Sequence, residues 1–205
     1  MTIRLHRGDL PDLSHYHVAA VAIDTEAMGL KPRRDRLCVV QLSPGDGSAD
    51  VVQLTAGETS APNLTKLLVD AAILKIFHFA RFDLGVLQNA LGVMPAPVYC
   101  TKIASRLART YTDKHGLKDL VRELLGVELS KQLQLSDWGA ADLTEAQVAY
   151  AASDVLHLHA LKAKLDAMLA REGREELAAA CLRFLPDRVR LDRAGWALED
   201  IFAHS

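Results

Sequence analysis

Two carboxylates stand two residues apart in Asp24-Thr25-Glu26, directly after the apolar run 18–23. Alternate side chains of an extended strand point to the same face, so Asp24 and Glu26 can face one site. Neighbouring carboxylates repel each other unless a cation neutralises them, and Mg²⁺ prefers oxygen ligands. The pair therefore suggests a divalent-metal site, although an isolated D-x-E also occurs in solvated turns and at helix starts.

A third carboxylate, Asp83, lies where the predicted strand 74–79 leads into the predicted helix 81–91. Taken alone, an acid in the first turn of a helix is explained by the positive end of the helix dipole. It also stands directly after a buried strand, at the same kind of boundary as Asp24. The position therefore allows Asp83 to join the site that Asp24 and Glu26 suggest.

A phenol and a fourth carboxylate follow in Tyr150-Ala151-Ala152-Ser153-Asp154. Helix positions four apart share one face, so Tyr150 and Asp154 can point the same way. Such a pair is often only a surface contact. Together with the earlier acids, however, it completes a set of four carboxylates and one phenol from different elements. Two closely spaced divalent ions need convergent carboxylates of this kind.

The elements predicted around these residues begin with strands and continue with helices. Three apolar runs with short turns between them indicate an antiparallel meander, at 18–23, 36–42 and 49–54. The pattern then alternates: helix 63–69, strand 74–79, helix 81–91 and strand 98–101. Helices follow at 117–125, 144–170 and 175–185, the last ended by Pro186. This order predicts one α/β domain with a mixed sheet.

Composition limits the possible partners. The chain has 205 residues, of which 50% are hydrophobic, so it can bury a full core and disorder is excluded as its main state. Its formal net charge is -2 and its aromatic content is 5%. Proteins that coat long nucleic acids are usually more basic, and base-stacking platforms need more aromatic residues. Any nucleic-acid contact is therefore expected to be local or limited to a few nucleotides.

Cysteine content and hydropathy indicate a compartment. The three cysteines, Cys38, Cys100 and Cys181, are odd in number and form no C-x-x-C motif. This argues against a disulfide framework and a cysteine zinc site. The N-terminus has no apolar run of signal-peptide length, and no run is long enough to span a bilayer. We therefore predict a cytoplasmic protein without membrane contact.

The acidic motifs resemble those of the DEDD 3′-to-5′ exonucleases, specifically the tyrosine branch that includes ribonuclease D. The matching segments are VAIDTEAMGLKPRRDRLCVVQL, KIFHFARFDLGVL, LTEAQVAYAASDVLHL and, between the last two, GLKDLVRELLGVELSKQLQLSDW. The resemblance extends over residues 18–165. The histidine branch carries its histidine at the position of Ala149, whereas here Tyr150 stands four residues before Asp154. The resemblance implies a ribonuclease H-like fold, a mixed β-sheet flanked by helices.

Ribonuclease D carries further helical domains after its nuclease domain, and here only residues 166–205 follow the matching region. The chain is therefore more similar to the compact nanoRNase C-like enzymes, which act on diribonucleotides and assemble into octameric rings. We expect an exonuclease domain at 1–170 and a C-terminal helical extension at 171–205. The apolar side chains of that extension either complete the core of a monomer or pack between subunits of a homo-oligomer.

The resemblance also implies the role of each acidic residue. Asp24, Glu26 and Asp154 would hold one ion of Mg²⁺ or Mn²⁺, with Asp24 bridging to a second ion. Asp83 would bind or orient the second ion through water. Tyr150, whose ordinary pKa is near 10, would mainly orient the attacking water. The product would be a nucleoside 5′-monophosphate released from a 3′ end.

Substrate-binding positions follow from the same resemblance. Met28, Gly29 and Leu30 come directly after the acids: Gly29 would let substrate approach the backbone, and Leu30 matches a base-wedging leucine or is an ordinary core leucine. His78 lies near substrate or is a hydrogen-bonded core histidine. The K-Q-SDW stretch adds Lys131, Gln134 and Trp138. A terminal phosphate could be met by Arg106, Lys114 or His115, and the sequence does not choose among them.

Three functional hypotheses remain open at this point. The leading one is a metal-dependent 3′-to-5′ exoribonuclease for RNA of a few nucleotides. The second is a ribonuclease D-like enzyme that trims longer structured RNA or DNA 3′ ends. The third is a non-catalytic nucleic-acid-binding scaffold, which usually lacks an acidic ligand, whereas all four acids are present here. Release of 5′-monophosphates from dinucleotides and from longer RNA would distinguish the three.

Overall fold

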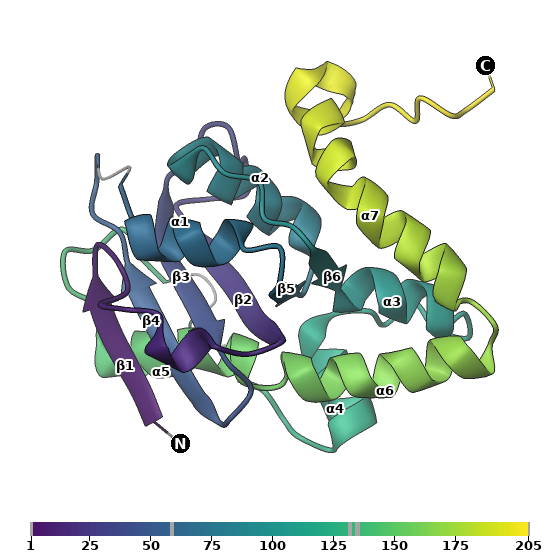
Figure 1. Cartoon of the computed structure of the whole chain (residues 1–205), viewed down its shortest axis with the longest axis horizontal. Coiled ribbons are helices and arrows are strands. Elements are labelled where there is room, and N and C mark those ends of the chain that lie inside the picture. Colours follow the sequence, from purple (N-terminus) through teal and green to yellow (C-terminus); the bar gives the residue numbers. More distant parts are fainter. Residues whose placement is uncertain (1, 58–59, 131–132, 134–135, 205) are drawn as a thin grey trace.

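The computed structural model describes residues 2–57, 60–130, 133 and 136–204. Along the chain, most strands come before most helices (Figure 1). The strands are β1 (Thr2–Arg7), β2 (Ala20–Ala27), β3 (Leu37–Ser43), β4 (Ser48–Gln53), β5 (Leu74–Phe77) and β6 (Val98–Cys100). The α-helices are α1 (Pro62–Val69), α2 (Ala80–Leu91), α3 (Thr101–Ala108), α4 (Leu117–Leu125), α5 (Glu145–Leu156), α6 (Leu158–Arg171) and α7 (Glu175–Leu191). Two short helical turns complete the elements, η1 (Ser14–Tyr16) and η2 (Asp192–Trp196).

The six strands form one mixed sheet in the order β1-β4-β3-β2-β5-β6. β2, β3 and β4 pair antiparallel, which confirms the predicted meander. β5 pairs parallel to β2, and β6 pairs parallel to β5. β2 therefore lies in the interior of the sheet between an antiparallel and a parallel neighbour, and it carries the D-x-E pair.

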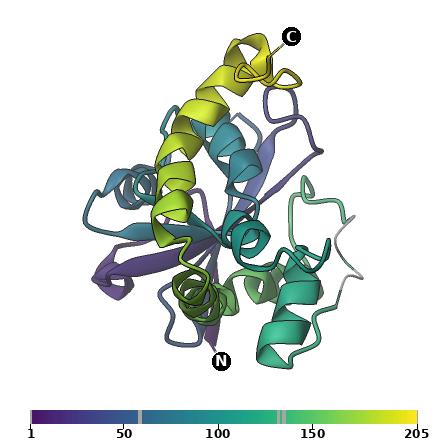
Figure 2. The same ribbon diagram turned by 90° about the vertical axis from the view of Figure 1, so that its right-hand side faces the viewer.

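Helices cover both faces of the sheet, which confirms the predicted α/β architecture. α5 packs across β1, β2, β3 and β4 on one face, while α1 and α2 lie on the other (Figure 1). α3, α4, α6 and α7 gather beyond β6, and α7 packs against α2, α3 and β6 (Figure 2). α2 and α5 contact β2 from opposite faces, so β2 can carry side chains toward both helices. No helix in the described part of the chain is both long and apolar enough to cross a bilayer.

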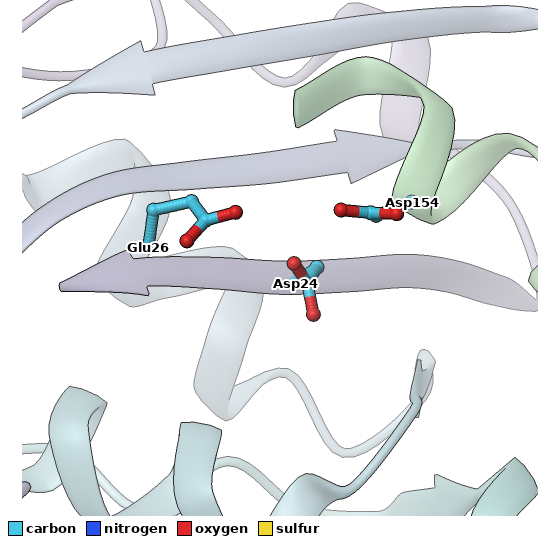
Figure 3. A group of neighbouring side chains, drawn as sticks. All are labelled: Asp24, Glu26 and Asp154. Carbon is cyan, nitrogen blue, oxygen red and sulfur yellow. The ribbon is translucent and has the colours of Figure 1, made fainter. Parts of the chain in front are cut away.

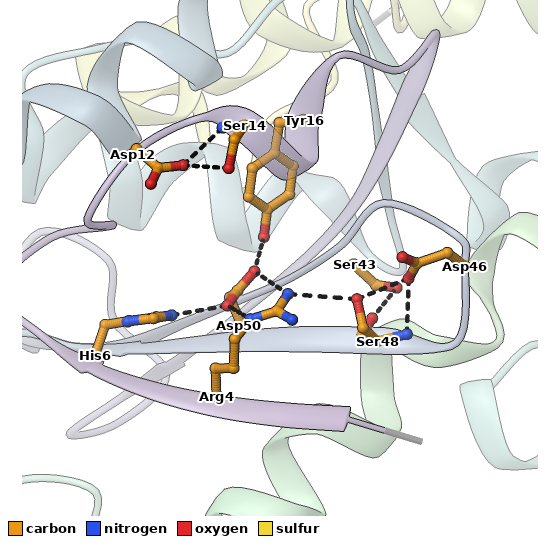
Figure 4. Close-up of polar contacts among 9 residues, drawn as sticks. All are labelled: Arg4, His6, Asp12, Ser14, Tyr16, Ser43, Asp46, Ser48 and Asp50. Atoms are coloured by element: carbon orange, nitrogen blue, oxygen red, sulfur yellow. Dashed lines mark hydrogen bonds and ion pairs between the residues drawn. The ribbon is translucent and has the colours of Figure 1, made fainter.

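β1 was not among the predicted strands, although the apolar and polar residues of TIRLHR alternate as in a half-buried strand. It pairs parallel to β4, and the buried Asp50 fastens it there. Asp50 accepts hydrogen bonds from Arg4 Nε and His6 Nε2, both at 2.7 Å, and from Tyr16 Oη at 2.6 Å (Figure 4). Burial alone would raise the pKa of Asp50, but these hydrogen bonds lower it to about 2. A long-range contact of this kind leaves no periodic signal in the sequence.

Three predicted boundaries were wrong. β2 continues past Asp24 to Ala27, so the acidic pair lies inside the strand and not after it. The predicted helix 144–170 is two helices that meet at His157, because α5 packs on the sheet whereas α6 packs on α3 and α4. α7 also continues through Pro186 to Leu191. A proline removes one backbone donor, and burial of Leu185 and Val189 offsets that loss.

Candidate active site

Two elements bring three of the four predicted acidic residues together. β2 supplies Asp24 and Glu26, and α5 supplies Asp154 from the helix that covers the same face of the sheet. One carboxylate oxygen of each residue lies within 4.8 Å of the others. Figure 3 shows the carboxylates of Glu26 and Asp154 pointing toward one another, with Asp24 beside the space between them. The strand period of two explains why Asp24 and Glu26 share this face.

Asp83 approaches β2 from the opposite face: it does not belong to the three-residue group within 4.8 Å, but its charge acts on Asp24 and Glu26. It lies in the first turn of α2, is 2% exposed, and accepts a 2.7 Å hydrogen bond from Thr25 Oγ1. Because Thr25 alternates with Asp24 and Glu26, its side chain points toward α2. The middle residue of the D-x-E motif thus ties Asp83 to the strand. Thr25 was not among the predicted site residues, although strand alternation would have placed it on the face opposite Asp24 and Glu26.

Burial disfavours the charged form of all four carboxyls, and repulsion from neighbouring acids adds to this effect for Asp24 and Glu26. Burial, followed by the charges of Asp83, Asp154 and Glu26, raises the pKa of Asp24 well above its ordinary value. Burial and the neighbouring acids raise the pKa of Glu26 to about 8. Burial raises the pKa values of Asp83 and Asp154 to about 7 each. A cluster of oxygen donors that resists ionisation without a cation is a fitting site for a hard divalent ion such as Mg²⁺ or Mn²⁺.

Tyr150 is half-buried on α5, one helical turn before Asp154. Burial and the charges of Asp154, Glu26 and Asp24 raise the pKa of its hydroxyl above the ordinary value. The phenol therefore keeps its proton at neutral pH and can donate a hydrogen bond. Trp138, which is 3% exposed, packs beside it with ring centroids 6.1 Å apart. The structure thus places Trp138 behind Tyr150, where it supports the phenol ring.

The predicted wedge, Leu30, is 86% exposed, so it is not a core leucine. It borders a cavity of about 650 Å³ whose wall also includes Phe79, Phe82 and Val189. Four arginines line the same cavity: Arg33, Arg34, Arg81 and Arg193. The combination of an apolar wall and cationic side chains suits a ligand with a flat ring and an anionic group.

Gly29 and Met28 have different surroundings. A Cβ added at Gly29 would lie 2.4 Å from Asp35 Oδ2, so glycine is needed for the approach of Asp35 to the backbone. Asp35 also accepts a 2.9 Å hydrogen bond from the Lys31 backbone, which fixes the loop that carries Leu30. Met28 is 56% exposed, and its sulfur packs beside Gly139. The loop is therefore held by its own contacts and presents Met28 and Leu30 outward.

His78 follows β5 at the end of the sheet nearest the acidic residues. Its Nδ1 lies 2.8 Å from Thr101 Oγ1, and burial together with the charge of Lys102 lowers its pKa to about 3. The ring is therefore neutral, and it also hydrogen-bonds the backbone of His115. This contact places the loop with Lys114 and His115 beside His78. Lys131 and Gln134 lie outside the described residues.

The loop beside His78 is anchored by a buried arginine. Arg109, which is fully buried, donates to Lys114 O at 2.7 Å and Ser105 Oγ at 3.1 Å, and it pairs with Glu123. Ser105 Oγ in turn lies 2.8 Å from His115 Nδ1. The exposed Arg106 lies on α3, just before Arg109. The three basic residues predicted near a terminal phosphate therefore come from one anchored segment.

Phe79 was not among the predicted site residues. It is 47% exposed, and its φ of 69° lies in the left-handed region that bulky residues rarely adopt. Lys102 Nζ lies 4.3 Å from its ring centroid. Backbone strain of this kind gathers at functional sites, and Phe79 stands between the strand end and the helix that carries Asp83. No glycine or turn motif in the sequence signals this conformation.

A family model described as 3′-5′ exonuclease matches residues 12–170. Ribonuclease D from Gluconacetobacter diazotrophicus is 40% identical over 167 residues, which are 82% of this chain and 42% of that protein. The chain thus spans less than half the length of the curated ribonuclease D relatives it matches.

Solved structures show the same fold. Brucella melitensis NrnC with bound Mg²⁺ is 63% identical, with a TM-score of 0.96 and full coverage of both chains. The same protein bound to pGG superposes with a TM-score of 0.97 at 64% identity, again with full coverage. Escherichia coli RNase D, described as an exoribonuclease involved in structured RNA processing, is 29% identical with a TM-score of 0.77. That match covers 86% of this chain and 46% of the other.

Proposed function

Because the chain belongs to the 3′-5′ exonuclease family and has the ribonuclease H-like fold of the DEDD exonucleases, we propose that it hydrolyses very short RNA from the 3′ end. Its products are nucleoside 5′-monophosphates. The observation that carries the proposal is the convergence of Asp24, Glu26 and Asp154 within 4.8 Å. Asp83 and Tyr150 complete the set of side chains that the reaction needs.

The proposed cofactors are two divalent ions, Mg²⁺ or Mn²⁺. Asp24, Glu26 and Asp154 would hold one ion, and Asp24 with Asp83 would serve the second. When bound, such ions lower the pKa of a bound water and neutralise charge on the phosphate. The donor set supports this proposal because it consists of buried carboxyl oxygens whose pKa values are raised. An Mg²⁺ complex is also known for the similar Brucella NrnC.

The chain's own side chains perform the remaining tasks. Tyr150 keeps its proton, and its hydroxyl donates a hydrogen bond that orients the attacking water. Thr25 holds Asp83 through the 2.7 Å hydrogen bond, which fixes one carboxylate of the site. The anchored segment with Lys114 and His115 lies on the side of His78, where it can meet an anionic end of the substrate.

Short RNA is favoured over long structured RNA by three observations. The net charge of -2 offers little general attraction for a long polyanion. The exposed Leu30 and the cavity beside it can enclose a terminal base. The full-length match to NrnC includes a complex with pGG, a very short ligand. Trimming of longer structured RNA or DNA 3′ ends is the second candidate, supported by the RNase D match. A non-catalytic scaffold is disfavoured because all four acids are present and three of them converge.

The proposal includes assembly and location. Apolar side chains at the end of the chain remain exposed, among them Leu198 at 104% and Phe202 at 75%. Such a surface supports a homo-oligomer, for which we propose the octameric ring implied by the family resemblance. The three cysteines are unpaired, which supports a reducing cytoplasmic environment.

The test compares substrates of different length under identical conditions. Purified protein is incubated with Mg²⁺ and either a diribonucleotide, a longer RNA oligomer or a deoxydinucleotide, and nucleoside 5′-monophosphate is measured by chromatography. We expect the highest kcat/KM for the diribonucleotide and no release with chelator. Asp154→Asn serves as the matched inactive control. Release of 3′-monophosphates, or equal turnover with chelator, would contradict the proposal.

A further inference from the structure

Gln41 is a fully buried polar residue in the interior strand β3. Among the residues that the structure describes, neither its Oε1 nor its Nε2 has a hydrogen-bond partner. A buried amide without partners costs free energy, because water satisfied both of its polar atoms in the unfolded chain. Most buried side-chain polar atoms are paired, so each exception requires an explanation.

The position of Gln41 in the sheet relates it to the acidic residues. The antiparallel register places Gln41 directly opposite Asp24 and Val39 opposite Glu26. Side chains directly opposite each other lie on the same face, with Cβ atoms about 4.5–5.5 Å apart. α5, which carries Tyr150 and Asp154, packs over this face of β3. The amide of Gln41 therefore lies in the wall of the acidic site, within reach of Asp24.

Packing alone does not explain a glutamine at this position. On the same face, Val39 precedes it by two residues and Val51 is its partner in β4. Another glutamine on this face, Gln53, has a structural use, since its Nε2 donates to Ala140 O at 2.9 Å and Ala141 O at 3.2 Å. Gln41 makes no such contact, and an apolar side chain of equal length would fill its space.

We propose that Gln41 is a positioning residue of the metal site, an inference that rests on the proposed metal-dependent function. Its Nε2–H donates a hydrogen bond to the carboxylate of Asp24 when that carboxylate turns to hold an ion. An ionised carboxylate only accepts hydrogen bonds, so the amide nitrogen is the atom that fits it. The bond fixes the plane of the Asp24 carboxylate, as residues behind metal ligands commonly do.

The test is Gln41→Met, which keeps the length of the side chain and removes both polar atoms. In chelator, the melting temperature should hold or rise, because an unpaired buried amide is lost. Mg²⁺ binding to the substrate-free protein, measured by calorimetric titration, should weaken by about tenfold or more. A side chain with a purely structural role would not give these opposite changes. Mg²⁺ affinity equal to that of the wild type would overturn the inference.

Gln53→Met is the matched control on the same face. It removes a donor that is paired in the structure, so its melting temperature should fall while its Mg²⁺ affinity stays at the wild-type value. If Gln41→Met does not fold, the wild type provides the answer by NMR. The Nε2–H₂ signals of Gln41 should shift on addition of Mg²⁺, and signals that stay in place would overturn the inference. A wild type that binds no Mg²⁺ would instead contradict the proposed function itself.

Discussion

The carboxyl of Asp154 lowers the stability of the metal-free protein, while it serves the proposed hydrolysis. It is held beside Asp24 and Glu26, and burial raises its pKa to about 7. Asp154→Asn keeps the shape and removes the charge. We expect the free energy of unfolding without metal at pH 8 to rise, because the buried carboxylate is ionised at that pH and destabilises the folded state, whereas the asparagine amide carries no charge. Turnover should fall on the order of a hundredfold or more. Thermal unfolding in chelator measures the stability, and dinucleotide hydrolysis measures the turnover. A variant with wild-type turnover would show that Asp154 is not part of the site.

The raised pKa values also predict a pH dependence. The pKa is about 7 for Asp83 and Asp154 and about 8 for Glu26, whereas unfolded carboxyls titrate near pH 4. The folded, metal-free protein therefore holds protons that the unfolded chain has released, so its stability falls as pH rises toward 8. The lowered pKa of His78, about 3, has the opposite effect below its unfolded value near 6.5.

The decrease in stability can therefore be measured between pH 6.5 and 8. Above pH 8 Lys75 has the opposite effect on stability, because burial lowers the pKa of its amine to about 8. We expect the melting temperature in chelator to decrease across this window, and saturating Mg²⁺ to remove the decrease. Mg²⁺ affinity should rise over the same range because binding displaces protons. Equal melting temperatures at both ends in chelator would show that the carboxyls ionise freely.

Tyr150→Phe separates the hydroxyl from the ring. The variant keeps the packing against Trp138, so stability should change little. Loss of the hydrogen bond that orients the attacking water should lower kcat on the order of a hundredfold. Mg²⁺ affinity should not change, because the phenol is not one of the metal ligands. The measurement is kcat at saturating dinucleotide, with Mg²⁺ titrated separately; an unchanged kcat would leave Tyr150 with a packing role alone.

Part of the site was predictable from local patterns. The D-x-E spacing predicted a shared face for Asp24 and Glu26 because a strand repeats every two residues. The conformation of Phe79 was not predictable, since its left-handed φ depends on packing around the strand–helix junction. The position of Gln41 was not predictable either, because strand register is set by the whole sheet.

At the scale of elements, the loop between β2 and β3 determines what lies beside the acidic residues. Asp35 binds back to the Lys31 backbone, and this contact leaves Leu30 exposed next to the cavity. Leu30→Ala should therefore leave the melting temperature unchanged. Its KM for dinucleotides should rise about tenfold, as expected when a buried contact of a leucine side chain with a base is lost.

Longer RNA provides the control for this loop. A longer substrate has other contacts, so its KM should rise less than that of a dinucleotide when Leu30 is replaced. The two KM ratios are measured with the same protein sample and the same Mg²⁺ concentration. Equal increases for both substrates would show that Leu30 does not contribute to length preference.

Local signals predicted the central elements well and the terminal ones less well. The meander β2-β3-β4 and the helix α2 follow from apolar runs and turns that lie close together in sequence. β1 depends on a salt bridge from Arg4 to Asp50, which are distant in the chain. The extent of α7 past Pro186 depends on helices and strands that pack against it. The pairing of β1 and the length of α7 are therefore set by tertiary contacts, which sequence periodicity does not encode.

At the scale of the whole molecule, the chain end differs from the rest of the surface. η2 is fastened to the domain: Arg81 pairs with Asp192 at 2.5 Å, and Arg33 donates to Arg193 O at 3.0 Å. Beyond it, Leu198 is fully exposed, whereas Phe202 packs against Phe184 of α7 with ring centroids 6.0 Å apart. The domain thus holds the base of this segment and leaves an apolar end exposed to solvent.

An exposed apolar end on a well-anchored base is typical of a surface that another subunit covers. Light scattering of the intact protein should therefore give a multiple of the 22.4 kDa chain mass. Leu198→Glu should reduce that mass without lowering the melting temperature of the dissociated chain, because the fully exposed Leu198 contributes little to its own fold. Leu5→Glu is the matched control, since Leu5 is 40% exposed and lies on β1, far from Leu198 in the sequence. A wild-type mass of one chain would rule out assembly, and an unchanged oligomer in Leu198→Glu would place the interface on another surface.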